Sequence, residues 1–334
     1  MIPPSSDTSS PLPPPAALAR PVLERIKDNG FIEAGPHDFR LGAPVTAPDG
    51  HWSPFATAPD GETLWWTATP RPLHESAEPF YYLAQYRTAT HLCASPASAL
   101  PPAVPAPRRF VFSVGRCGST LLGQLAAGAG LTALSEPDAL TPFALTRDAG
   151  NDAPAALHAR LVYAPVLDRC LEGWRTGAAE EAALVKLRAQ HSNASHLALI
   201  LDTVARPAFT FVFREPRAWA RSMAGHFGLP VDRLVALYSA PIAAHAAAMR
   251  AGAEATVLHY EAMRGDGREA ADVALAALGL PPGAASLPDT SSQQGTRLAR
   301  PPADTPAVRR TVHAFMERWP DIRAGAAAGL DLAN

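Results

Sequence analysis

Lysine is scarce in this chain of 334 residues. Lys27 and Lys186 are the only two lysines, so 27 of the 29 basic residues are arginine. Arginine presents a planar fork of hydrogen-bond donors, whereas lysine carries a compact charge on a titratable amine. A lysine that persists in such an arginine-rich chain is a candidate for a role that arginine cannot fill. Lys186, which lies in an apolar run, is therefore a candidate functional residue.

Cysteine, net charge and long apolar runs are scarce as well. The three cysteines, Cys93, Cys117 and Cys170, are widely spaced and form no C-x-x-C pair, which argues against a disulfide framework and a zinc site. A net charge of −2 argues against nucleic acid as a partner. There is no signal-peptide pattern and no run of about 18 apolar residues. We therefore expect a cytoplasmic protein without a membrane span, and the sequence does not indicate its oligomeric state.

Composition divides the chain into four parts. Residues 1–15 are rich in proline and serine, which predicts a disordered tail. Residues 16–97 carry aromatic, strand-like runs such as F-Y-Y-L-A-Q-Y-R (80–87), separated by P-D-G turns. We interpret them as a small β-rich domain in which a short helix precedes an antiparallel sheet. Residues 98–107 are a linker by composition, and residues 108–334 form the larger domain.

The sequence pattern changes after residue 108, where short apolar runs alternate with longer alanine-rich stretches. This alternation favours a mostly parallel sheet with helices on both faces, which is a three-layer α/β sandwich. An amphipathic helix near the C-terminus is expected to pack on this domain. The expected strands are 109–114, 183–188, 208–214 and 255–260, and the expected helices are 120–129, 196–204, 217–227, 268–278 and 307–319.

The first of these strands runs into V-G-R-C-G-S-T-L-L (114–122), which has the features of an anion site. Gly115 and Gly118 allow a tight turn, and the N-terminus of the following helix attracts negative charge. Arg116 can add a guanidinium to the bound group. The lysine of the nucleotide-triphosphatase loop G-x-x-x-x-G-K-[ST] is missing, and an ordinary strand-to-helix turn is the alternative. The residues expected to hold the anion are Gly115, Arg116, Cys117, Gly118, Ser119 and Thr120.

A second segment, F-V-F-R-E-P-R-A-W-A-R-S-M (211–223), pairs a strand end with a helix. Arg214 ends the strand, and Ser222 lies eight residues later, about one and a half turns into the helix. A guanidinium and a hydroxyl that meet there suit a dianionic phosphate. The alternative is a surface Arg214 that pairs with Glu215 or Asp202, with Ser222 merely exposed.

Together the two segments resemble the signature elements of sulfotransferases that use 3′-phosphoadenosine 5′-phosphosulfate (PAPS). The resemblance covers roughly residues 108–320, and the segments lie 99 residues apart (115 to 214) in the order of that family. Arg116 makes it closer to the tyrosylprotein and carbohydrate branch than to the cytosolic branch. It implies a P-loop NTPase-like fold in which the first loop holds the 5′-phosphosulfate, while Arg214 and Ser222 hold the 3′-phosphate.

The resemblance also implies a reaction and further site residues. A sulfuryl group would move from PAPS to a hydroxyl or amine of a small molecule, glycan or peptide, with release of 3′-phosphoadenosine 5′-phosphate (PAP) and without a metal. Lys186, in V-K-L-R, would contact the sulfuryl group or its bridging oxygen, and together with Arg116 it would stabilise developing charge. Arg297 or Arg300, in S-Q-Q-G-T-R-L-A-R (292–300), would reach the 3′-phosphate, and the sequence does not decide between them.

The general base is the point at which the sequence departs from the cytosolic branch. That branch has a histidine two residues after its lysine, where this chain has Arg188. The other branch uses a glutamate after the first helix, so Glu136 is expected here, with Asp138 and His191 as alternatives. The competing interpretation is that Glu136 caps a following helix, since S-E-P-D is a good helix start with proline at the first helical position.

Two other functions remain open at this stage. A nucleotide-dependent kinase or other phosphotransferase with a degenerate loop would bind ATP–magnesium tightly and PAP weakly. A non-catalytic module that keeps a nucleotide pocket would bind PAP without turnover.

Overall fold

The computed structural model describes ten stretches of the chain. They are residues 18–27, 35–58, 61–76, 78–148, 154–174, 182–190, 193–264, 267–286, 303–325 and 330. The predicted tail at 1–15, the alternative base His191, and both Arg297 and Arg300 lie outside the described residues.

The chain divides into two compact units that are not contiguous in sequence. One comprises Met1–Val104, Pro137–Thr146 and Gly150–Ala179, and the other comprises Pro105–Glu136, Arg147–Ala149 and Glu180–Asn334. The sequence-based division differs, because it assigns everything after residue 108 to one domain. The reason is that helix α4 (Pro154–Trp174) packs on strand β4 (His51–Thr57) of the first unit. Composition alone does not reveal that long-range contact.

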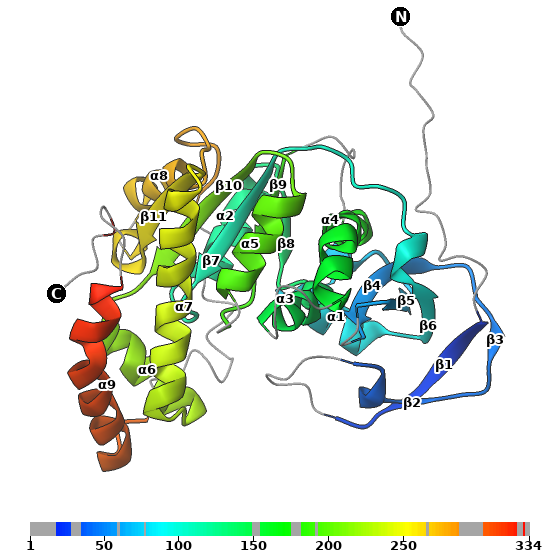
Figure 1. The fold of residues 1–334 in the computed structure, drawn as a ribbon, viewed down its shortest axis with the longest axis horizontal. Coiled ribbons are helices and arrows are strands. Elements are labelled where there is room, and N and C mark those ends of the chain that lie inside the picture. The colour runs from blue at the N-terminus through cyan, green and yellow to red at the C-terminus, as the bar shows by residue number, and fades with distance from the viewer. Residues whose placement is uncertain are drawn as a thin grey trace, which may run out of the picture. The chain divides into compact units, whose positions relative to one another are not determined.

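The first unit is built on an antiparallel sheet with the strand order β2-β1-β6-β5-β4, and β3 pairs with β1 at the side (Figure 1). A separate β-rich sheet is therefore confirmed. The other elements of this unit are β1 (Leu18–Arg25), β2 (Phe39–Leu41), β3 (Val45–Thr46), β5 (Thr63–Thr69), β6 (His91–Pro96) and α1 (Tyr81–Thr88), and α3 (Thr141–Asp148) lies mostly within it.

Two details of the predicted first domain are wrong. The segment that opens it is strand β1 rather than a short helix, and the aromatic run at 80–87 is mostly helix α1 rather than a strand. Short apolar runs have no period that separates helix from strand. Tertiary contacts decide here, because the buried side-chain amide of Gln85 donates hydrogen bonds to the carbonyl oxygens of Ser53 (3.3 Å) and Pro54 (2.8 Å) on β4.

The second unit contains a parallel sheet of five strands in the order β11-β10-β7-β9-β8. The predicted parallel sheet is confirmed, and the expected elements are present with small differences at their ends. The short strand β8, with the sequence T-A-L-S, was not predicted. The strands are β7 (Arg108–Ser113), β8 (Thr132–Ser135), β9 (Ala183–Lys186), β10 (Pro207–Phe213) and β11 (Glu254–His259). The helices are α2 (Ser119–Gly128), α5 (Asn193–Thr203), α6 (Pro216–Phe227), α7 (Val231–Arg250), α8 (Arg268–Ala277) and α9 (Pro306–Ala324).

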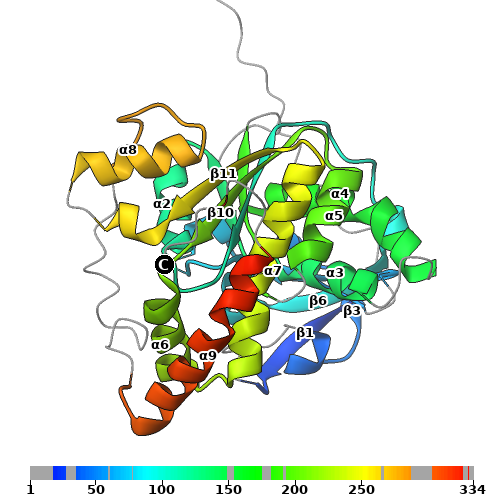
Figure 2. The same ribbon diagram turned by 60° about the vertical axis from the view of Figure 1, so that its left-hand side comes forward.

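The winding of this sheet reverses at β7. The chain moves from β7 to β8 in one direction and from β9 through β10 to β11 in the other. Because parallel crossovers are right-handed, α2 lies on one face, where it contacts α8, and α5 and α7 lie on the other. Helix α9 packs on α6 and α7 (Figure 2). Open α/β sheets bind ligands beyond the carboxyl ends of their strands at such a reversal.

Aromatic side chains fill the centre of the parallel sheet. Phe112 of β7 and Phe211 of β10 are paired in register, and their stacked rings lie 5.4 Å apart between centroids. The ring of His245, on α7, meets Phe211 edge-on at 5.1 Å. Both phenylalanines are fully buried. This packing fixes the two strands whose ends carry the first loop and Arg214.

Replacing Phe211 with alanine is therefore expected to destabilise the protein by about 3–5 kcal/mol, because it leaves a cavity in a packed core. The measurement is the midpoint of urea unfolding followed by circular dichroism. Val273→Ala, on the partly exposed face of α8, is the control and should change stability by less than about 0.5 kcal/mol. Equal midpoints for the two variants would contradict this description of the core.

Candidate anion-binding site

The residues singled out in the sequence meet at the carboxyl edge of the parallel sheet. The loop at 114–118 follows β7, Glu136 directly follows β8, Lys186 is the last residue of β9, and Arg214 directly follows β10. These four strands are neighbours in the sheet, so their carboxyl ends lie along one edge. That edge contains the reversal of winding.

The backbone of the first loop has the conformation of an anion cradle. Gly115, Arg116 and Gly118 have φ angles of 75°, 51° and 79°, all in the left-handed region. Successive amides in such turns form concave nests that bind anions. Helix α2 begins immediately afterwards at Ser119, with Gly118 as its N-cap, so its first N–H groups face the same place. Thr120, in the first turn, is half-buried.

Glycine at position 118 is required by packing as well as by its φ angle. A Cβ atom there would lie 2.9 Å from Cε of Met263 and 2.9 Å from Cδ2 of Tyr260. The Cys117 side chain beside it is fully buried, and burial raises the pKa of its thiol. Cys117 could therefore contribute to an anion site only through its backbone.

Trp219 fixes the loop from helix α6, and it was missed in the sequence analysis. Its indole N–H donates to the carbonyl oxygens of Val114 and Gly115, both at 2.9 Å, and the side chain is fully buried. These bonds hold both carbonyl oxygens toward the indole of Trp219. The signal in the sequence was a single tryptophan in the polar helix that follows Arg214.

Arg214 is bonded to the loop. Its Nη1 donates to the carbonyl oxygen of Arg116 at 2.9 Å, and its guanidinium carbon lies 4.8 Å from the ring centroid of Tyr260. The Tyr238 hydroxyl donates to the carbonyl oxygen of Arg214 at 2.6 Å. The Nε of Arg214 is buried and has no hydrogen-bond partner within the described part of the chain. A buried donor of this kind is costly unless a ligand accepts from it.

Ser222 contacts Arg116, whereas the sequence analysis paired it with Arg214. Ser222 Oγ accepts from Nε of Arg116 at 3.2 Å, and Nη2 of Arg116 lies 3.0 Å from Nε2 of His226. Since a guanidinium only donates, the His226 nitrogen accepts and its proton lies on Nδ1. Ser222 is buried, which contradicts the alternative of an exposed serine. Glu215 instead caps α6 by accepting from the N–H groups of Arg217 and Ala218.

Glu136 lies between two cations. Its Oε1 accepts from Nζ of Lys186, and its Oε2 lies 3.5 Å from Nε of Arg188. The side chains of Lys186, Arg188 and Glu136 are 4%, 12% and 14% exposed. The 3₁₀ turn at Asp138–Leu140 that follows has Pro137 as its N-cap and no side-chain cap. The interpretation of Glu136 as a helix cap is therefore wrong, and Asp138 belongs to the first unit.

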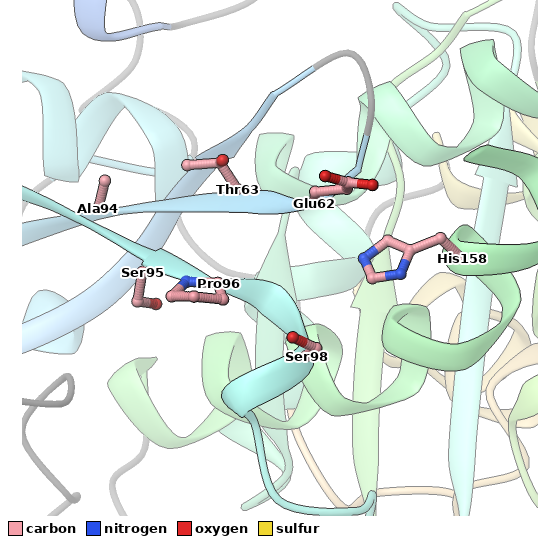
Figure 3. Close-up of a pocket in the computed structure, with 7 residues that line it drawn as sticks. All are labelled: Glu62, Thr63, Ala94, Ser95, Pro96, Ser98 and His158. Atoms are coloured by element: carbon pink, nitrogen blue, oxygen red, sulfur yellow. The ribbon is translucent and has the colours of Figure 1, made fainter. Parts of the chain in front are cut away.

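No predicted site residue lines the cavity of about 640 Å³ that lies in the first unit (Figure 3). It is lined by Glu62, Thr63, Ala94, Ser95, Pro96, Ser98 and His158. Within the described ranges, no three histidine, cysteine or acidic side chains are grouped so that they could hold a metal ion. No described helix is long and apolar enough to cross a bilayer.

No family model matches the sequence, and no curated protein matches it. Two solved structures are similar to the chain. The sulfotransferase domain from the Synechococcus PCC 7002 olefin synthase is 18% identical with a TM-score of 0.38, over 69% of this chain and 92% of that domain. The sulfotransferase domain from the curacin biosynthetic pathway is 13% identical with a TM-score of 0.33, over 70% and 95%. These values do not assign the chain to a family.

Proposed function

We propose that the protein transfers a sulfuryl group from PAPS to a hydroxyl or amine of a small molecule, glycan or peptide and releases PAP. The observation that carries the proposal is the bond between the two predicted segments. Arg214 donates to the backbone of the cradle after β7 and keeps a second, buried donor without a partner in the described chain. A ligand with two separate anionic ends suits such a pair of sites.

The two ends of the ligand are assigned to the two segments. The cradle at 115–120 and the N-terminus of α2 would hold the 5′-phosphosulfate. Arg214 would hold the 3′-phosphate from the strand side, with Ser222 on the helix that follows. Burial, and then the charge of Arg214, lower the pKa of Arg116, so a bound anion near both guanidiniums would relieve their repulsion.

Transfer in this scheme relies on positioning and charge stabilisation. The acceptor oxygen or nitrogen attacks sulfur as the bond from sulfur to the 5′-phosphate oxygen breaks, and PAP keeps the electron pair of that bond. Glu136 takes the proton from the acceptor and later returns it to solvent. Lys186 and Arg116 stabilise the charge that develops on the sulfuryl and leaving oxygens.

Ligand preference separates this proposal from the phosphotransferase. PAP is expected to raise the melting temperature, because a ligand at about 100 times its Kd adds roughly 2.7 kcal/mol of stability, and ATP–magnesium is expected to raise it less. Arg214→Ala should lose the shift with PAP. Arg217→Ala removes an exposed arginine three residues further on, in the first turn of α6, and should keep the shift. A larger shift with ATP–magnesium, or an unchanged shift in Arg214→Ala, contradicts the proposal.

Turnover separates an enzyme from a non-catalytic module. Glu136→Gln should lower kcat for PAP release from PAPS by about 10²–10⁴-fold with little change in KM for PAPS, since it removes a general base and leaves the cradle intact. The assay uses water and an added phenol as acceptors. Glu254→Gln, at the opposite edge of the sheet, is the control. Stabilisation by PAP together with no turnover in the unmodified protein would support the non-catalytic module.

A further inference from the structure

We propose that Arg188 is a positioning residue that holds the Glu136 carboxylate in place while Lys186 turns to the sulfuryl group. The inference rests on the proposed function, in which Glu136 is the base. It concerns a residue that the resemblance leaves without a role, since Arg188 stands where the cytosolic branch has a histidine.

The contacts of Glu136 show why its carboxylate needs a second cation. Lys186 donates to Oε1 of Glu136. Its ammonium therefore occupies the position from which Oε1 would accept the proton of the sulfuryl acceptor. Arg188 approaches the other oxygen at 3.5 Å, as an ion pair rather than a short hydrogen bond. Glu136 can therefore act as a base through Oε1 only after Lys186 has moved away from that oxygen. A carboxylate of low exposure that lost both cations would be poorly stabilised.

Lysine and arginine suit these two tasks differently. The lysine ammonium is a point charge on a flexible stem and can turn from Oε1 to a sulfuryl oxygen. The arginine fork is planar and loses less freedom for each bond that it makes. When Lys186 moves, Arg188 remains on Oε2 and Oε1 becomes open to the acceptor proton.

The backbone around Arg188 is fixed on two sides. Just before it, the N–H of Leu187 donates to the carbonyl oxygen of Val111 on β7 at 3.1 Å. Just after it, the fully buried Asn193 at the start of α5, with its amide nitrogen turned to the loop, donates to the carbonyl oxygens of Arg188 (3.2 Å) and Gln190 (3.3 Å). The guanidinium thus extends from an anchored point of the chain.

The backbone of Glu136 is held in a strained conformation. Its φ angle is 57°, in the left-handed region that is uncommon for a residue other than glycine and that persists only where the surroundings enforce it. The N–H of Glu136 donates to the carbonyl oxygen of Lys186 at 2.7 Å, so the strain is maintained by the end of β9. The same strand end that carries Lys186 and leads into Arg188 thereby holds the backbone from which the carboxylate extends.

Kinetics of Arg188 variants test the proposal in the full-length protein. Arg188→Met should lower kcat for PAP release from PAPS by about 100-fold, which is the loss expected when a reacting group is misplaced by about 1 Å. KM for PAPS should stay unchanged, because the cradle and Arg214 are intact. Arg188→Lys should recover part of kcat. Arg109→Met is the matched control, because Arg109 is similarly buried and pairs with Glu254 at the opposite edge of the same sheet.

A second measurement needs neither ligand nor turnover. Carbodiimide coupling of glycine amide to Glu136, followed by peptide mass spectrometry, reports how firmly the carboxylate is held. Lys186→Met should keep coupling slow, and Lys186→Met combined with Arg188→Met should increase it several-fold. Circular dichroism confirms that each variant is folded. Equal coupling in the single and double variants would overturn the inference whatever the activity.

The outcomes distinguish this inference from the proposed function. If Glu136→Gln loses turnover while Arg188→Met has wild-type kcat, the positioning role is wrong and the sulfotransferase proposal stands. If PAP fails to stabilise the unmodified protein, the proposed function fails, and the coupling experiment still decides whether Arg188 holds Glu136. A KM for PAPS that rises with unchanged kcat in Arg188→Met would place Arg188 in ligand binding and overturn its positioning role.

Discussion

The arrangement at the carboxyl edge is constrained by Arg116 and Arg214, two like charges held close together by the bond between Arg214 and the Arg116 backbone. Burial and this neighbour both disfavour the charged form of Arg116. The protein accommodates the pair by giving each guanidinium neutral acceptors: Arg116 bonds to Ser222 and lies against His226, and Arg214 bonds to the loop carbonyl. None of the acceptors named here carries a negative charge. Under the proposed function, an anion bound beside both guanidiniums would stabilise the pair further.

The topology of the parallel sheet brings the residues of the candidate site together, so no long connections are needed. Parallel strands carry their carboxyl ends to one edge, and the reversal of winding at β7 turns the following helices to opposite faces. Residues 115, 136, 186 and 214, far apart in sequence, therefore meet without long loops. Trp219 and Gly118 then set the loop itself, one through bonds to its carbonyl oxygens and the other by allowing Tyr260 to pack against it.

Sequence reasoning succeeded where the pattern is local and failed where distant contacts decide. The strands around Phe112 and Phe211 are continuous apolar runs between turn signals, which is typical of buried parallel strands. The glycines of the first loop indicate a tight turn. Strand β8 has only four residues, too few to show a period, so its pairing with β9 supplies the evidence that its sequence lacks. Helix α1 and the partner of Ser222 were misassigned because side-chain contacts across the fold determine them.

The two lysines of the chain occupy similar chemical surroundings. Each is paired with a carboxylate of low exposure: Lys27 lies 3.2 Å from Asp38, and Lys186 bonds to Glu136. Arg214, in contrast, bonds to a backbone carbonyl oxygen and stacks on Tyr260, which uses the planar shape of its guanidinium. At position 186 the side chain is almost fully enclosed, and its ammonium bonds to a carboxylate of low exposure. A compact charge on a flexible stem suits that enclosed position, whereas the planar fork of arginine suits the stacked position of Arg214.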